Sequence, residues 1–354
     1  MSQGRYAHLW PGVPLALASA ILFGASTPLS KLLLAAIDPQ ILAGALYLGA
    51  GFGLAALRRA SAARGLLTDE APLRKKDLPW LGGAVIFGGV LGPLFLMLGL
   101  ARTDAASGSL LLNLESLSSM GIAWLVFQEN VDRRLLLGAF SIVLGAALLS
   151  WTGQGVALNQ GAALIAAACL AWGIDNNLTR KLSGADPTQI AMIKGLVAGT
   201  VNVGLALWRG AILPAPMFLG AAGFVGFLGI GLSLVAFILA LRHLGAARTG
   251  AYFSLAPFIG AMLSLVILHD PFTARLFVAG LLMGLGLWIH LNEEHVHEHE
   301  HEGLEHEHSH VHDAHHRHAH AEPAQEPHSH WHRHEPLRHA HPHYPDLHHR
   351  HHHG

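Results

Sequence analysis

One acidic residue, Glu115, lies inside a long apolar stretch of the chain, residues 105–127. An ionised side chain at the centre of a bilayer costs roughly 3 kcal/mol on insertion scales, so an acid at such a depth is a functional candidate by default. Glu115 is therefore predicted to carry a proton or to contact a cationic solute. The alternative is structural: a protonated Glu115, bonded to Asn113 or Ser118, would only hold helices together.

Three consecutive polar residues, Asp175, Asn176 and Asn177, lie near the end of another apolar stretch, residues 157–178. Three adjacent side chains on one helix cannot all face the same partner helix, so some of them are expected to line a water-filled cavity. The alternative is that this stretch ends earlier, at Gly173, and that the three residues form a cap at the membrane surface.

A lysine, Lys194, begins the next apolar stretch and is a candidate ion-pair partner for Asp175. The alternative is that its ammonium group extends to the membrane surface. We predict that a solute or a coupling ion contacts Glu115, Asp175 and Lys194. The amide side chains predicted to take part are those of Asn113, Asn176 and Asn177.

Histidine supplies a different chemistry at the C-terminal end. Of the 28 histidines, all but His8, His243, His269 and His290 lie at or after residue 295. Neutral imidazole is a good ligand for zinc, nickel, copper and cobalt, and His-x-His places neighbouring rings within reach of one ion. We predict that the tail, residues 295–354, is disordered and binds such divalent metals, while no cofactor is required. The predicted ligands are His295, His297, His299, His301, His306, His308, His310 and His312.

The elements that must position the buried polar residues are transmembrane helices. The chain is 52% hydrophobic and 13% charged, against about 25% charged in an ordinary soluble domain. A spanning helix needs roughly 20 mostly apolar residues. The sequence predicts an all-α polytopic membrane protein with about ten spans, near 12–36, 40–57, 79–100, 105–127, 135–151, 157–178, 189–208, 217–241, 246–268 and 275–291.

The distribution of Lys and Arg predicts the orientation of these spans. With the N-terminus in the cytoplasm, most basic loop residues lie inside, and only Arg102, Arg209 and Arg275 lie outside. An even number of spans then places both termini in the cytoplasm. We expect an integral protein of the plasma (inner) membrane of a bacterium, with the first apolar run kept as a helix rather than cleaved as a signal peptide.

The chain also repeats itself. The segment 23–31 matches 172–180, and Asp38-Pro39 and Asp186-Pro187 follow at similar distances. Later, the segment 105–129 matches 246–270. Five helices per half is an odd number, so the second copy must cross the membrane upside down, as in secondary transporters with inverted repeats. The predicted domains are 1–151, 152–294 and the tail 295–354.

On these segments, together with Ala171-Trp172-Gly173, the chain resembles the drug/metabolite transporter superfamily and its EamA-type branch. The resemblance covers roughly residues 12–291 and implies a ten-helix carrier of small solutes. The family often has a basic residue early in the second helix of each half. Here the second half has Lys194, while the first half offers Leu46 or Tyr47.

The function predicted from these observations is secondary transport of a small organic solute or metabolite by alternating access. A transition-metal permease for nickel, cobalt or zinc and a metal-responsive membrane sensor remain the alternatives. No nucleotide-binding loop or catalytic constellation is present, so an enzyme is not expected. The expected partners are the lipid bilayer, the solute and divalent metals, without nucleic acid, and a homodimer is kept open beside a monomer.

Overall fold

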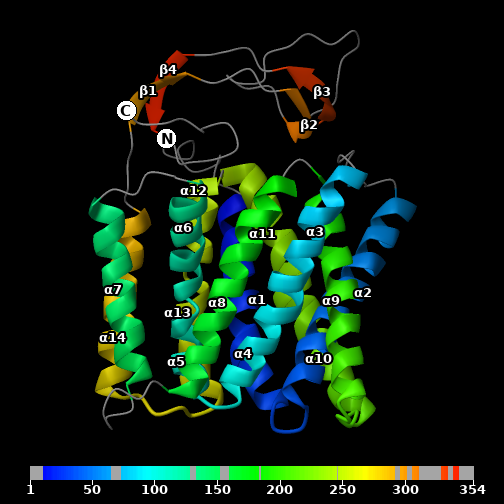
Figure 1. Ribbon diagram of the computed structural model, residues 1–354, viewed down its shortest axis with the longest axis vertical. Helices are drawn as coiled ribbons and strands as arrows, with labels where there is room; N and C mark the ends of the chain where they lie inside the picture. The colour runs from blue at the N-terminus through cyan, green and yellow to red at the C-terminus, as the bar shows by residue number, and fades with distance from the viewer. Residues whose placement is uncertain are drawn as a thin grey trace, which may run out of the picture.

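The computed structural model describes most of the bundle and four short pieces of the tail. The described residues are 11–64, 73–127, 133–151, 159–182, 185–244, 246–291, 296–300, 305–310, 328–333 and 338–342. Long helices run side by side in the described bundle (Figure 1). Eight of its helices are long and apolar enough to cross a membrane. The shorter apolar helix Ala274–His290 and the more polar Gln160–Thr179 pack into the same bundle.

The first half of the bundle contains the following elements: α1 (Gly12–Leu33), α2 (Pro39–Ala63), η2 (Lys75–Asp77), α3 (Leu78–Ala84), η3 (Val85–Leu91), α4 (Gly92–Leu100), α5 (Ala105–Leu111), α6 (Leu114–Phe127) and α7 (Arg133–Ser150). The second half contains α8 (Gln160–Thr179), η4 (Arg180–Leu182), α9 (Pro187–Trp208), α10 (Pro216–Gly226), η5 (Phe227–Leu232), α11 (Ser233–Leu244), α12 (Ala246–Phe253), α13 (Ala256–Ile267) and α14 (Ala274–Leu291). These bounds agree with the predicted spans, apart from shifts at their ends.

The Asp-Pro pairs start equivalent helices in the two halves. Asp38 accepts hydrogen bonds from the backbone N–H groups of Gln40 and Ile41, and Asp186 accepts them in the same way from Thr188 and Gln189. The following proline occupies the first helical position, where a missing N–H costs nothing. The same local chemistry therefore begins α2 and α9.

Equivalent helices of the two halves pack against each other in opposite directions. α2 packs most extensively against α9, and α7 against α14. Near the start of α7, Leu135 lies beside His290 at the end of α14, whereas Trp151 just after α7 lies beside Arg275 at the start of α14. The two halves are thus inverted with respect to each other, as the odd number of helices per repeat predicts.

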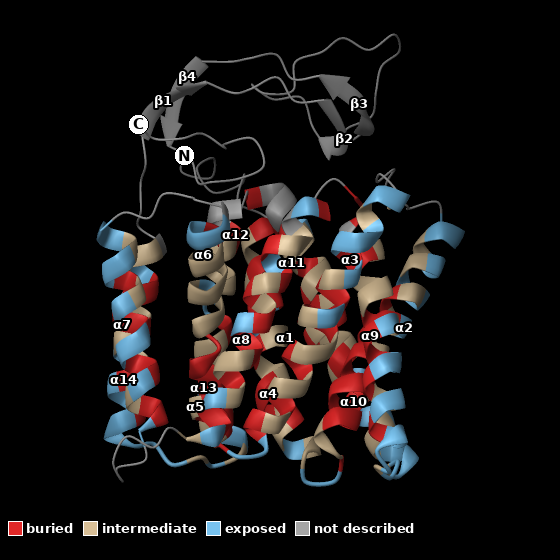
Figure 2. Cartoon of the chain, in the orientation of Figure 1, coloured by how far each residue is buried: buried red, intermediate tan, exposed pale blue. Residues whose placement is uncertain are grey.

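The third spanning segment of each half contains a π-helical turn, η3 in the first half and η5 in the second. Such turns occur often at functional sites. Buried positions gather in the interior of the bundle, and exposed positions lie mainly on its outer faces and at its ends (Figure 2). Exposed apolar side chains include Phe52, Phe140 and Trp288. An apolar outer surface is what a lipid environment stabilises.

The described tail residues form strands, although disorder was the expectation for this segment. β1 (Val296–Glu300) pairs with β4 (Arg338–Pro342), and β2 (Glu305–His310) pairs with β3 (His328–Arg333), both antiparallel. The sequence alternates with period two there, which is compatible with pairing of extended chains. The disorder expected of the tail as a whole stays a prediction.

Candidate functional site

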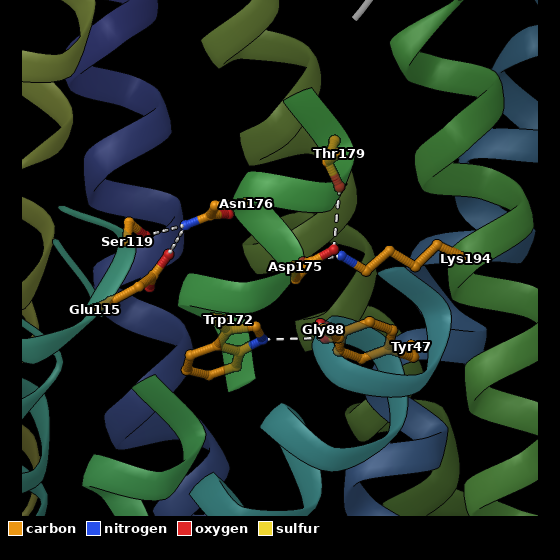
Figure 3. Close-up of polar contacts among 9 residues, drawn as sticks. All are labelled: Tyr47, Gly88, Glu115, Ser119, Trp172, Asp175, Asn176, Thr179 and Lys194. Carbon is orange, nitrogen blue, oxygen red and sulfur yellow. Dashed lines mark hydrogen bonds and ion pairs between the residues drawn. The ribbon is translucent and has the colours of Figure 1, made fainter. Parts of the chain in front are cut away.

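The carbonyl oxygen of Gly88, halfway along the third spanning segment, is released from the helical hydrogen-bond ladder. Gly92 donates its N–H to Phe87, and Pro93 has no N–H to donate. The Gly88 oxygen instead accepts the hydroxyl of Tyr47 from α2 at 2.8 Å and the indole Nε1 of Trp172 from α8 at 3.0 Å (Figure 3). These bonds satisfy a carbonyl that burial would otherwise leave unpaired, and they join three helices.

A third side chain reaches the same π-helical turn. Asn202 of α9 is fully buried, and its Nδ2 lies 3.4 Å from the carbonyl oxygen of Gly89 and 3.3 Å from that of Val90. Gly89 is the residue to which the missing N–H of Pro93 would point in a regular α-helix. The irregular backbone of η3 thus has polar partners on α2, α8 and α9.

Beside this turn, the carboxylate of Asp175 pairs with the ammonium group of Lys194. Their side chains are only 6% and 17% exposed. The hydroxyl of Thr179 donates a hydrogen bond to Asp175 at 3.1 Å (Figure 3). A Cβ atom on Gly88 would collide with the Asp175 carboxylate, so glycine is required there for α8 to approach η3. Because a lone buried charge is strongly destabilising, each member of the pair depends on the other.

Glu115 belongs to a second polar contact on the other face of α8. The Nδ2 of Asn176 donates to Oε1 of Glu115 and to Oγ of Ser119, each at 3.0 Å (Figure 3). Glu115 is half-buried and Asn176 is exposed. The hydrogen-bond partner of the Glu115 side chain is thus on α8, rather than Asn113 or Ser118 as the structural alternative supposed. Ser118 donates instead to the carbonyl of Leu114.

The polar residues of α8 face different helices, as the sequence predicts. Asp175 points toward η3 and α9, whereas Asn176 points toward α6. Asn177 also meets α6, donating to the carbonyl of Ser119 at 3.1 Å and to that of Gly173 in its own helix at 2.8 Å. The helix α8 itself continues past all three residues to Thr179.

Asn113 lies apart from this cluster. It occupies the turn between α5 and α6, donates to the carbonyl of Leu110 at 2.8 Å and lies against the sulfur of Met283 in α14. Its predicted role at the site stays a prediction, but the structure places it with the α5–α14 contact. The residues that do lie together are called the central cluster below. They are Tyr47, Gly88, Glu115, Ser119, Trp172, Asp175, Asn176, Thr179 and Lys194.

The predicted metal ligands belong to the tail. His295, His301 and His312 lie outside the described residues, while His297 and His299 lie on β1 and His306, His308 and His310 lie on β2. In the described part of the chain, no three histidine, cysteine or carboxylate side chains gather closely enough to hold a metal ion.

The equivalent contact in the other half carries no charge. Ser26 of α1 stands where the repeat places Asp175, and it meets Gly229 of η5, as Asp175 meets Gly88 of η3. Ser26 donates to the carbonyl of Phe23 in its own helix, at 2.6 Å. The fold therefore offers two similar helix contacts, and only the one between α8 and η3 has acquired an ion pair.

Sequence reasoning missed Tyr47, Trp172, Ser119, Thr179 and Asn202. The sequence did contain a signal for some of them. Pro93, which follows Gly88-Gly89, has no N–H, so this helix must lose a backbone hydrogen bond and its free carbonyl groups need side-chain donors from other helices. The position at which the sequence showed Leu46 or Tyr47 in place of a basic residue is also informative. Tyr47 reaches the cluster from α2, just as Lys194 reaches it from α9.

This architecture, an inverted helical bundle around a polar cluster, defines a polytopic membrane protein of the transporter class. The EamA-like transporter family matches the chain twice, over residues 10–151 and 159–291. The chain belongs to this family, and it is a membrane transporter rather than an enzyme.

Two similar proteins support the assignment. A protein of Methanothermobacter thermautotrophicus described as an uncharacterized transporter is 30% identical over 303 residues, which cover 81% of this chain and 88% of the relative. A solved structure titled only as the crystal structure of a protein superposes with a TM-score of 0.58 at 18% identity. It covers 79% of this chain and 95% of its own, and it supports the fold alone.

Proposed function

We propose that the chain is a secondary transporter that moves a small organic solute by alternating access, with the central cluster as its binding site. The observation that carries this proposal is the Asp175–Lys194 ion pair, which joins α8 and α9 of the second half directly beside Gly88 of the first half and next to the Glu115–Asn176 contact. Inverted-repeat transporters bind their solutes where the repeats meet, near the middle of the membrane. Packing alone does not require two acids and a lysine at this depth.

The chemistry of the cluster favours a solute that carries both an ammonium and a carboxylate group. Such a solute can replace the Asp175–Lys194 pair with two new pairs and leave no charge alone. A solute with one charge would leave either Asp175 or Lys194 unpaired, and the loss of one partner of a buried pair costs about 3–5 kcal/mol. A neutral solute would have to compete with the ion pair using hydrogen bonds alone.

Glu115 is the candidate for proton coupling. It is not part of the ion pair. Its side-chain hydrogen-bond partner, Asn176, is an amide, which can serve either protonation state of Glu115 by rotating to donate or accept. Asn176 is exposed within a spanning helix, and an amide is far better solvated by water than by lipid. Water at Asn176 would give Glu115 a route for protons.

We also propose that the chain lies in the inner membrane of a bacterium with both termini in the cytoplasm, and the distribution of Lys and Arg supports this orientation. We propose that the histidine-rich tail binds divalent zinc, nickel, copper or cobalt there and modulates transport without forming the path. No organic cofactor is needed for this scheme, since the solute gradient or a proton gradient supplies the energy.

Transport by the purified chain in liposomes tests the proposal. Labelled zwitterionic, cationic, anionic and neutral metabolites, and divalent metals, are compared at equal concentrations with protein-free liposomes. Faster movement of zwitterionic solutes, abolished by Asp175→Asn, is expected. Movement of metals without that of any organic solute would replace the proposal with the metal-permease alternative.

A further inference from the structure

Two ion pairs join the same two helices at opposite ends of the bundle. At one end, Arg209, just after α9, binds both carboxylate oxygens of Asp38 at 2.6 Å, and its Nε donates to Gln40 at 2.9 Å. At the other end, Arg58 near the end of α2 binds Asp186 at 2.6 Å. Asp38 caps α2 and Asp186 caps α9. Each cap residue of one repeat thus meets an arginine from the far end of its counterpart helix in the other repeat.

Between these ends, α2 and α9 touch through glycine. A Cβ atom on Gly44 would lie 2.8 Å from the carbonyl oxygen of Gly199, and one on Gly199 would lie 2.8 Å from that of Gly44. A Cβ atom on Gly195 would lie 2.8 Å from the carbonyl oxygen of Tyr47 and 2.9 Å from the backbone nitrogen of Gly51. The two backbones are therefore in direct contact about this crossing.

A close contact at the middle with a separable polar contact at each end has the geometry of a lever. If α2 and α9 rock about Gly44, Gly51, Gly195 and Gly199, one pair of helix ends moves apart while the other stays together. Both ion pairs are formed in this structure. We propose that Arg58–Asp186 and Arg209–Asp38 are two alternating latches, each broken when the transporter opens to its own side of the membrane.

Rocking of α2 and α9 would move residues of the central cluster, because both helices contribute side chains to it. Lys194 lies on α9 between the Asp186 cap and Gly195, directly next to the crossing, and Tyr47 lies on α2 between Gly44 and Gly51. Rocking about the glycines changes the position of Lys194 relative to Asp175 on α8. This inference therefore rests on the proposed function, in which that pair binds the solute.

The latches differ in exposure. Arg58 and Asp186 are 34% and 11% exposed at the side chain, whereas Arg209 and Asp38 are 51% and 25% exposed. The more buried pair is less screened by water and salt. Loss of Arg58 is therefore expected to shift the conformational equilibrium further than loss of Arg209.

The test changes the arginines, since changing either aspartate would also remove a helix cap. Arg58→Gln and Arg209→Gln are made in the full chain with Cys169→Ala and one reporter, Asn176→Cys. A membrane-impermeant maleimide is applied from each side, using vesicles of either orientation. Arg58→Gln should raise the labelling rate severalfold from the side where α1 begins and lower it from the other side. Arg209→Gln should do the reverse, with a smaller change.

Three further variants keep the result interpretable. Arg58→Lys and Arg209→Lys retain the charge and should return labelling toward the reference rates. Arg102→Gln is the matched control, because the side chain of Arg102 donates to Leu98 in its own segment rather than across the repeats. The latches would be overturned if the labelling rate changed equally from both sides, or if it changed no more than in the Arg102→Gln control. Labelling needs no known solute, so the latch can fail or hold independently of the transport assay.

Discussion

Tyr47 and Trp172, which come from different halves of the chain, donate hydrogen bonds to the same carbonyl oxygen, that of Gly88, at 2.8 Å and 3.0 Å. The acceptor exists because a π-helical turn and a proline leave Gly88 without a donor in its own helix. The two repeats are thus joined at a backbone irregularity, next to the Asp175–Lys194 pair. A site built in this way depends on the fit of α8 against η3 at Gly88.

Gly88→Ala should disrupt that fit. The added methyl group would collide with the Asp175 carboxylate, so α8 must move away from η3 and the ion pair must be disturbed. We expect a loss of stability of about 1–3 kcal/mol, as for other overpacked interiors, and a loss of transport. Thermal unfolding of the detergent-solubilised protein and liposome transport measure the two effects.

Gly82→Ala is the matched control for that change. Gly82 lies on α3 in the same spanning segment, and nothing lies within 4 Å of a Cβ atom placed there. Alanine is the better helix former, so Gly82→Ala should leave transport unchanged and keep or slightly raise the unfolding temperature. If Gly88→Ala and Gly82→Ala have the same stability and the same transport rate, the contact between Gly88 and Asp175 contributes to neither property.

Asp175 and Lys194 should be coupled in stability. Asp175→Asn and Lys194→Met each leave one buried charge without its partner and should each destabilise the protein by about 3–5 kcal/mol. The double variant removes both charges and should be more stable than the sum of the two single changes predicts. The unfolding temperatures of all four proteins provide the measurement, and additive effects would show that the two charges are not paired in solution.

Glu115→Gln should separate proton coupling from packing. Glutamine keeps the shape of the side chain and its ability to bond to Asn176, but it cannot titrate. We expect the variant to fold and to lose the pH dependence of transport, with a lower rate under a proton gradient. Normal transport by a well-expressed Glu115→Gln protein at every pH would instead assign Glu115 to helix packing.

The sequence predicted the framework of the molecule because its signals are local. Apolar length defined the spans, and the repeat, which includes Asp38-Pro39 and Asp186-Pro187, defined the inverted halves. It also brought Asp175 and Lys194 together correctly, since two opposite charges buried in neighbouring stretches have few other partners. Asn113 is near Glu115 in the chain but turns toward α14, and its role in transport stays a prediction.

The contacts around η3 could not be predicted in the same way. A π-helical turn changes which carbonyls are free by a shift of one residue in the hydrogen-bond register, and an apolar sequence does not display this shift. Tyr47 and Trp172 have the composition of ordinary core residues, and their hydrogen bonds depend on where the released carbonyl points. The strands β1 to β4 were missed because a low-complexity tail has no apolar face to indicate pairing.

Truncation after Glu294 should leave insertion and solute transport intact while removing most metal binding. The described bundle contains the central cluster and both α2–α9 ion pairs, and none of these contacts involves a described tail residue. Metal binding by the full chain should weaken steeply below about pH 6.5, because imidazole must be neutral to act as a ligand. Equilibrium dialysis with zinc and nickel, on the full and truncated proteins, measures this difference. If truncation abolished transport of every solute in a well-inserted protein, the tail would belong to the transport path, and the metal-permease alternative would become the better account.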